Sequence, residues 1–286
     1  MNAQRLPRYT RGNLLRKTNQ VAPALRKVKS PFDSNPQVLV TRPREQATEL
    51  VALLHEHGFA PVRFPAIAIR PIAPNPALDA ALERLADYDW VVFTSVNGVR
   101  IAWERALQLD KTAGLQTAQV AAIGPKTAAA LRHRGVSPAF VPAEYVAEAI
   151  LPGLGDLRGR RVLLLRAAQA RQALPQYIRR AGGQADEIPV YETVPGQPSP
   201  SAWSALRRGV DYLTFTSPST ARYFVDLVRR ADLDPLDLPG APRVVCIGPI
   251  TAAAARQLGF VVAAVARPYT AEGLADTLVR LATSDT

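Results

Sequence analysis

The residues best suited to hold a ligand lie in four short loops, each between an apolar run and a helical pattern. These loops are Ser95, Gly124-Pro125, Ser217-Pro218 and Gly248-Pro249. Proline suits the first helical turn, because the N–H that it lacks would have no helical partner there. Glycine and serine leave the neighbouring N–H groups accessible, and such helix starts bind anions. The loops predict a polyanionic ligand, with well-capped helices and no ligand as the alternative.

Three basic residues could add contacts to the carboxylates of such a ligand. Arg42 and Arg166 stand at the end of matching apolar runs, where a guanidinium can form charge-assisted hydrogen bonds. The alternative is that both are ordinary surface arginines. Lys126, two residues after Gly124, is either a further carboxylate contact or simply an exposed side chain.

The motifs of other chemistries are absent from the sequence. There is no P-loop and no G-x-S-x-G elbow, and Gly153 and Gly155 lack the third glycine of a dinucleotide site. His55 and His57 have no second cluster that would complete a zinc site. Cys246, the single cysteine, lies in a strand-like run and is expected in the core. We therefore expect no metal and no cofactor.

The composition fits a globular protein of about two domains. The chain has 286 residues, of which 48% are apolar. No apolar run approaches the roughly 20 residues of a membrane helix, and the longest, Phe260–Ala266, suits a buried strand. One cysteine excludes a disulfide scaffold. The expected location is the cytoplasm, with no membrane contact.

The net charge of +11 is concentrated at the N-terminus. Residues 1–36 hold eight basic side chains and one acidic side chain, so 37–286 carry a net charge of only +4. We expect 1–36 to be a disordered basic extension. The alternative is a targeting peptide for an organelle, since such peptides are also Arg-rich and acid-poor. Because the rest of the chain is nearly balanced, nucleic acid is not an expected partner.

From residue 37 onward the sequence repeats at an offset of about 124 residues. The clearest matches are Val38–Arg42 with Val162–Arg166, Phe93–Ser95 with Phe215–Ser217, and Ile123–Pro125 with Ile247–Pro249. In each copy, continuous apolar runs alternate with helical patterns. This alternation predicts an α/β fold whose parallel sheets are covered on both faces. Val62–Ile69 is one of the expected strands.

Prolines indicate where the domains separate. Each copy has a cluster inside it: Pro65, Pro71, Pro74 and Pro76, then Pro189, Pro195, Pro198 and Pro200. Such clusters form stiff extended connectors, here expected at about 65–76 and 189–200. Two domains of nearly equal size result if the chain leaves the first, builds the second and returns. Domain 1 is then 37–68 plus 196–284, and domain 2 is 73–190. A tandem division near Gly155–Gly159 is the alternative.

One position breaks the repeat in a way that suggests chemistry. Tyr191 follows Pro189 by two residues, whereas Ile67 follows Pro65. A phenol present in one copy only, beside a connector, is a candidate proton donor or hydrogen-bonding group. The alternative is a tyrosine that packs its ring and reaches water with its hydroxyl.

Over about 37–284 the chain resembles the uroporphyrinogen-III synthase family. The resemblance rests on the order and spacing of Thr41-Arg42-Pro43, Phe93-Thr94-Ser95-Val96-Asn97-Gly98, Ile123-Gly124-Pro125-Lys126-Thr127-Ala128, Val190-Tyr191-Glu192-Thr193, Phe215-Thr216-Ser217-Pro218-Ser219 and Ile247-Gly248-Pro249-Ile250-Thr251-Ala252. It implies two flavodoxin-like parallel-sheet domains joined by a two-stranded connector, the first domain being discontinuous. It also implies an enzyme, a cofactor-independent lyase of tetrapyrrole biosynthesis.

The family's reaction cyclises hydroxymethylbilane with inversion of the terminal pyrrole ring and loss of water. The substrate is a linear tetrapyrrole with eight carboxylates, which agrees with the anion-binding loops. The resemblance places Tyr191 as the group that assists hydroxyl departure. The expected substrate contacts are Arg42, Ser95, Gly124, Lys126, Thr127, Arg166, Ser217, Ser219, Gly248 and Thr251. We expect a monomer that makes transient contact with the enzyme supplying the bilane. A non-catalytic, two-lobed anion-binding or regulatory module of the same fold is the alternative.

Overall fold

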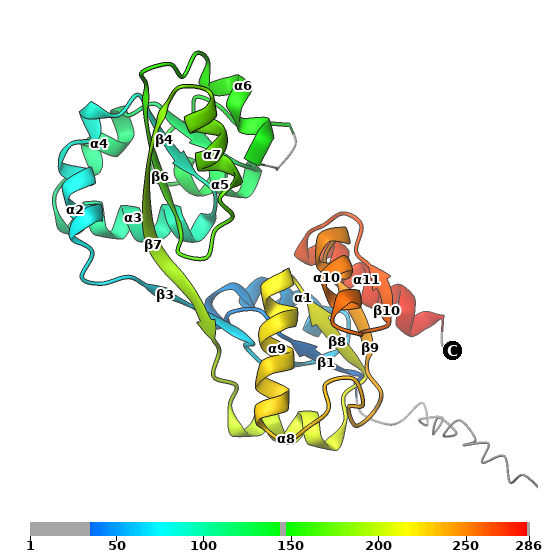
Figure 1. Cartoon of the computed structure of the whole chain (residues 1–286). Coiled ribbons are helices and arrows are strands. Elements are labelled where there is room, and N and C mark those ends of the chain that lie inside the picture. The colour runs from blue at the N-terminus through cyan, green and yellow to red at the C-terminus, as the bar shows by residue number, and fades with distance from the viewer. Residues whose placement is uncertain (1–34, 144–146, 285–286) are drawn as a thin grey trace, which may run out of the picture. The chain divides into compact units, whose positions relative to one another are not determined.

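The computed structural model describes residues 35–143 and 147–284, with no account of the side chains of 147 and 148. The expectation of a disordered extension over 1–36 therefore falls almost entirely outside the described residues. In the described part of the chain, strands alternate with helices and form two five-stranded sheets (Figure 1). No helix in these residues has the length and apolar character needed to cross a bilayer.

The first sheet is built from both ends of the chain. Its order is β10-β9-β8-β1-β2, and all neighbouring strands are parallel. The strands are β1 (Gln37–Val40), β2 (Ala60–Arg63), β8 (Tyr212–Phe215), β9 (Arg243–Cys246) and β10 (Val262–Val265). One face is covered by α1 (Thr48–Glu56) and α11 (Ala271–Thr283). The other is covered by α8 (Pro200–Arg208), α9 (Pro218–Arg230) and α10 (Pro249–Gln257). The buried central strands explain why their apolar runs are continuous.

The second sheet is built from the middle of the chain. Its order is β3-β7-β6-β4-β5. The strands are β3 (Ile67–Pro71), β4 (Trp90–Phe93), β5 (Val120–Ala122), β6 (Arg161–Ala167) and β7 (Gln184–Pro195). One face packs against α2 (Pro76–Glu83), α3 (Val96–Gln108), α4 (Thr112–Thr117) and α5 (Pro125–Arg132). The other packs against α6 (Leu151–Leu154) and α7 (Ala173–Arg180). Short 3-10 turns occupy Arg44–Gln46, Leu85–Asp87 and Ala147–Ile150.

The two sheets have the same strand order once the repeat is taken into account. At the 124-residue offset, β6 and β7 correspond to β1 and β2, while β4 and β5 correspond to β8 and β9. The series β2-β1-β8-β9 in one sheet is therefore matched by β7-β6-β4-β5 in the other. Each lobe combines units from both sequence copies. The expected α/β class, with a discontinuous first domain, is confirmed.

β3 and β7 form the two-stranded connector. They pair antiparallel from Ile67 opposite Pro195 to Pro71 opposite Tyr191. The other strand pairs of the second sheet are parallel. This ladder confirms that the two proline-rich segments run side by side. The domain boundaries given above stay predictions.

The expectation of one strand over Val62–Ile69 is wrong. β2 ends at Arg63, β3 begins at Ile67, and the two strands belong to different sheets. Pro65 lies between them, and the N–H groups of Phe64 and Ala66 on either side still donate to the Val40 and Thr41 carbonyls. The opposite segment also approaches closely: a Cβ on Gly196 would lie 2.0 Å from the Pro65 carbonyl oxygen. The chain therefore stops pairing with the β1 segment at Ala66 and pairs with β7 from Ile67 onward.

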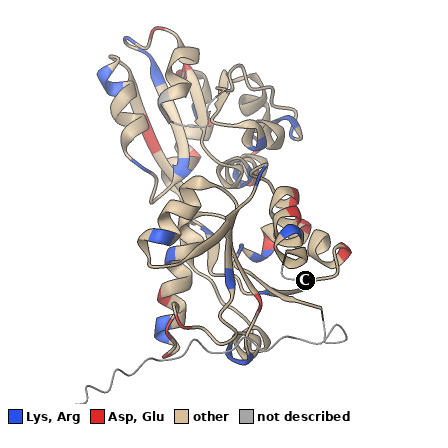
Figure 2. Cartoon of the chain, turned by 90° about the vertical axis from the view of Figure 1, so that its right-hand side faces the viewer, with Lys and Arg blue, Asp and Glu red and all other residues tan. Residues whose placement is uncertain are grey.

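The expectation of a buried strand over Phe260–Ala266 is only partly correct. β10 covers Val262–Val265, but it is an edge strand, and Val261 before it is 88% exposed. Basic and acidic residues are interspersed over the ribbon of both lobes (Figure 2). This distribution agrees with the small net charge calculated for residues 37–286.

Candidate active site

The two serine loops are helix caps, as the sequence predicts. Ser95 Oγ accepts a hydrogen bond from the Gly98 N–H at 3.0 Å at the start of α3. Ser217 Oγ accepts from the Thr220 N–H at 3.1 Å, and Thr220 Oγ1 accepts from the Ser217 N–H at 3.1 Å. Ser95 and Ser217 therefore occupy the same place in the two lobes. Only Ser217 has the reciprocal capping box.

The two glycine loops leave their helix starts without a side-chain cap. Gly124 and Gly248 are the N-cap residues of α5 and α10, and proline is the first helical residue in both. The N–H groups of the first turn have no partner within a helix. Thr127 and Thr251 are 5% and 4% exposed in these turns. Helix starts without a side-chain cap are what the anion-binding prediction requires, and each of these two has a buried threonine in its first turn.

All four loops follow parallel strands, so in each sheet a pair of them shares the carboxyl edge. Ser95 and Gly124 follow the adjacent strands β4 and β5, and Ser217 and Gly248 follow the adjacent strands β8 and β9. In each sheet the order reverses beside the serine loop, between β6 and β4 and between β1 and β8. Ligands of open parallel sheets bind at such reversal points.

Tyr191 lies on β7, and its hydroxyl contacts the serine loop at the reversal point of the second sheet. Its hydroxyl is 3.0 Å from Ser95 Oγ, and either atom can donate. The ring packs in the lobe core, and the residue is 7% exposed. The register of β6 against β7 shifts next to it, where Ala167 faces Tyr191. The packed ring agrees with the alternative interpretation, in which Tyr191 packs its ring and reaches water with its hydroxyl. The hydroxyl does not agree with it, because it contacts Ser95 and the residue is almost fully buried.

Arg166 is not the ordinary surface arginine of the alternative interpretation. It is 5% exposed, its Nη1 lies 3.4 Å from Glu187 Oε2, and its Nη2 donates to the Arg171 carbonyl. Its Nε has no partner among the described residues. Burial lowers the pKa of Arg166, and the nearby Glu187 and Tyr191 partly oppose this effect. The side chain already stabilises the loop after β6, and Nε is its one nitrogen without a partner among the described residues.

Arg42 is more available than Arg166 for contact with a ligand carboxylate. It is half-buried after β1, and its Nη1 is buried with no partner in residues 35–143 and 147–284. Burial lowers its pKa, which Glu49 partly opposes. An unpaired buried donor is costly, so an incoming carboxylate would be favoured there.

The remaining predicted contacts differ in exposure. Lys126 is exposed in the first turn of α5, and its repeat counterpart Ile250 is 66% exposed in α10. Ser219 is half-buried, and its Oγ accepts from Arg222 at 3.4 Å. The exposure of Lys126 and of its counterpart Ile250 is consistent with both interpretations of Lys126, a carboxylate contact or simply an exposed side chain.

Sequence reasoning missed the role of Gly98. A Cβ at this position would lie 2.9 Å from the Leu165 carbonyl oxygen and 3.4 Å from Ser95 Oγ. Glycine therefore allows α3 to approach β6 closely and keeps the Ser95 cap in place. The signal that could have revealed it is the spacing of Ser95 and Gly98, a cap and its N–H donor.

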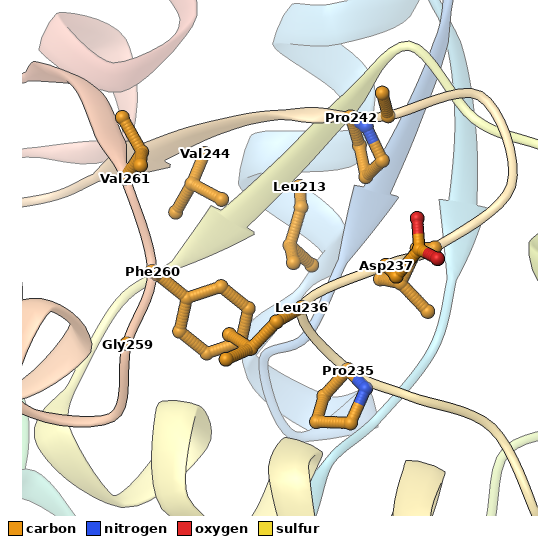
Figure 3. Close-up of a pocket in the computed structure, with 11 residues that line it drawn as sticks. Leu213, Pro235, Leu236, Asp237, Pro242, Val244, Gly259, Phe260 and Val261 are labelled. Carbon is orange, nitrogen blue, oxygen red and sulfur yellow. The ribbon is translucent and has the colours of Figure 1, made fainter. Parts of the chain in front are cut away.

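A small apolar pocket lies away from these loops (Figure 3). It measures about 180 Å³ and lies among Leu213, Leu236, Val244 and Phe260, with Leu236 against the Phe260 ring. None of the predicted site residues lines it. In the part of the chain that the structure describes, no three His, Cys, Asp or Glu side chains gather as a metal site.

Comparisons with known proteins agree on one family. Residues 48–276 match the family model described as uroporphyrinogen-III synthase HemD. A uroporphyrinogen-III synthase from Chlorobaculum parvum is 31% identical, covering 78% of this chain and 89% of that protein. One from Synechococcus elongatus is 29% identical, covering 83% and 92%. A porphyrin biosynthesis protein HemD from Ruminiclostridium josui is 30% identical over 86% of this chain, which spans about half of that protein's length.

Solved structures show the same fold. A mutant uroporphyrinogen III synthase from Thermus thermophilus superimposes with a TM-score of 0.62 at 23% identity, covering 87% of this chain and 99% of that one. A uroporphyrinogen-III synthetase from Helicobacter pylori gives a TM-score of 0.59 at 18% identity, covering 86% and 99%. The family model spans most of the chain, and the fold agrees with it. The chain belongs to the uroporphyrinogen-III synthase family.

Proposed function

We propose that this protein is a uroporphyrinogen-III synthase, a lyase that cyclises hydroxymethylbilane with inversion of the last pyrrole ring and loss of water. Family membership supports the activity. The observation that carries the mechanism is the 3.0 Å contact between Tyr191 and Ser95 at the strand-order reversal of the second lobe. This contact supports the proposal, because it joins a proton-bearing phenol to one of the loops suited to carboxylates.

In this proposal Tyr191 assists departure of the substrate hydroxyl. The phenol donates its proton as the carbon–oxygen bond breaks, and water leaves. The pyrrole nitrogen gives up its proton in turn, which restores the phenol and leaves a neutral azafulvene. Ser95 Oγ already accepts from the Gly98 N–H, so its own proton is free to stabilise the transient phenolate. The step as a whole releases one molecule of water from the bilane and returns Tyr191 to its original protonation state.

The second requirement is conformational. In water the bilane closes without inversion, so the enzyme must favour attack through the substituted α-carbon of the terminal ring. That attack gives a spiro intermediate, which fragments and recloses with the ring turned over. Holding the carboxylates fixes the chain in the reactive conformation. The proposed anchors are the first turns of α5 and α10, with Thr127 and Thr251, together with Arg42.

We also propose that the two domains, 37–68 plus 196–284 and 73–190, close on the substrate by bending the connectors at about 65–76 and 189–200. The proposed form is a cytoplasmic monomer that receives the bilane directly from the enzyme making it. Direct transfer shortens the time in which the free bilane can close to the wrong isomer. Gel filtration of the protein alone tests whether it is a monomer. Gel filtration of a mixture with the enzyme that makes the bilane tests whether the two proteins associate.

Growth of a bacterial strain that lacks its own uroporphyrinogen-III synthase tests the function. Expression of this chain is expected to restore haem-dependent growth, and the Y191F variant is expected to restore it poorly. A folded, expressed protein that restores no growth would favour the non-catalytic anion-binding module instead.

A further inference from the structure

A groove of about 1040 Å³ follows the open edge of the first sheet. It is lined by the edge strand β2 and the start of the connector, and also by His55 of α1 and Arg208 of α8. Ligand pockets commonly measure about 300–1,000 Å³. The groove is therefore large enough for a ligand of several rings.

Arginines dominate the charge of this groove. Its lining includes Arg42, Arg44, Arg63, Arg70 and Arg208, with Glu45 as the acidic member. Arg70 is paired with Glu192 at 2.8 Å. For Arg44, Arg63 and Arg208 the described residues provide no ion-pair partner. Three unpaired guanidinium groups in one groove are suited to a ligand that carries several carboxylates.

Unsatisfied polar atoms point to the same place. In residues 35–143 and 147–284, three buried side-chain atoms lack a hydrogen-bond partner, and two of them belong to Gln37 and Arg42 in this lining. Buried polar atoms in folded proteins normally have partners. Gln37 Oε1 can accept and Arg42 Nη1 can donate. The groove therefore offers both donors and an acceptor to a ligand.

The strand edge in the groove disfavours a protein strand as the ligand. An exposed sheet edge can pair with another chain, but proline on the edge removes N–H donors. Pro61 lies within β2, and Pro65 lies two residues after its end. Apolar side chains such as Val62 and Ile67 line the same groove. A lining of both apolar and charged side chains fits rings that carry peripheral carboxylates.

We propose that this groove is an accessory binding site for a tetrapyrrole polycarboxylate, one that shares Arg42 with the proposed substrate anchors but is lined neither by Tyr191 nor by the four loops. The ligand class rests on the proposed function, whereas the preference for a multi-ring polycarboxylate rests on the groove alone. Arg42 links the groove to the carboxyl edge of the first sheet, where the Ser217 and Gly248 loops lie. The site would hold a bilane before reaction or a product after it.

Titration of the protein with uroporphyrin, a stable octacarboxylate, tests the proposal by fluorescence quenching. The R63Q/R208Q variant removes two exposed groove charges and leaves the proposed Tyr191 site intact. The R229Q/R230Q variant is the control, since it removes two exposed charges from the end of α9. We expect two porphyrins per parent chain. In R63Q/R208Q one of them should bind roughly 10–100-fold more weakly, since each charge-assisted contact supplies about tenfold.

The outcomes separate this proposal from the proposed function. A single porphyrin per parent chain, or R63Q/R208Q titrating like the control, would overturn the accessory site even if the parent forms the type III isomer. Two porphyrins with selective weakening of one would support the site even if no type III isomer forms. In the supporting case, R63Q/R208Q should form type III at the parent rate when bilane is saturating.

Discussion

The structure predicts that Ser95 and Tyr191 are energetically coupled in catalysis. The two oxygens are 3.0 Å apart, and Tyr191 is 7% exposed, so water cannot easily replace Ser95 as its partner. General acid–base assistance contributes roughly 10²–10⁴-fold to a rate. The free bilane also loses its hydroxyl unaided, so the effect of Tyr191→Phe should lie at the lower end of this range. We expect the substitution to lower kcat about 100-fold.

Ser95→Ala acts on the same hydroxyl indirectly. It should lower kcat about tenfold, equivalent to about 1.4 kcal/mol. It should also cost about 1 kcal/mol of folding stability through loss of the α3 cap. If Ser95 acts only through Tyr191, Ser95→Ala adds no further loss of kcat once Tyr191→Phe is present. The double-mutant cycle should then give a coupling of about 1.4 kcal/mol.

Ser217→Ala provides the matched control. It removes the equivalent cap in the other lobe, where the structure gives Ser217 no tyrosine partner among its described contacts. It should lower the free energy of unfolding by a similar amount and leave kcat uncoupled to Tyr191. The assay is the initial rate of type III isomer formation at several bilane concentrations, which separates kcat from KM. Additive losses from Ser95→Ala and Tyr191→Phe would refute the reasoning.

Three further predictions concern stability and reactivity. Gly98→Ala should lower the free energy of unfolding by about 1–3 kcal/mol in urea titrations, because its Cβ would lie 2.9 Å from the Leu165 carbonyl oxygen; unchanged stability would disprove that close contact. Glu187→Leu should cost about 1–3 kcal/mol by leaving the buried Arg166 without its carboxylate, and a neutral result would mean that the pair does not stabilise the loop. Burial raises the pKa of the Cys246 thiol to about 12, so it should react with a thiol reagent at pH 8 only after unfolding. Its contribution to stability should be complete below the unfolded pKa of about 8.5 and be lost as the pH rises toward 12, which pH-dependent unfolding curves would check.

The sequence was sufficient for the loops and the connector because both depend on local rules. The Ser95 and Ser217 caps follow from helix-start chemistry, and the repeated prolines mark the paired connectors. Periodicity also placed Cys246 in a strand, where it is fully buried. The repeat then predicted that equivalent loops would recur in both sheets.

Non-local contacts account for what the sequence could not predict. Val62–Ile69 is continuously apolar apart from one arginine and one proline, yet it divides between two sheets, and from Ile67 onward it pairs with a segment more than 120 residues away. The ion pair between Arg166 and Glu187 joins residues 21 positions apart. The bond between Tyr191 and Ser95 joins residues 96 positions apart. No spacing rule connects such pairs.

The isomer composition of the product tests the proposed synthase activity most directly. Hydroxymethylbilane is generated in situ, the purified protein is added at a small fraction of the bilane concentration, and the oxidised porphyrins are separated by chromatography. The proposed synthase activity predicts mainly the type III isomer, in molar excess over the protein. Type I alone, or type III limited to one equivalent per chain, would contradict it.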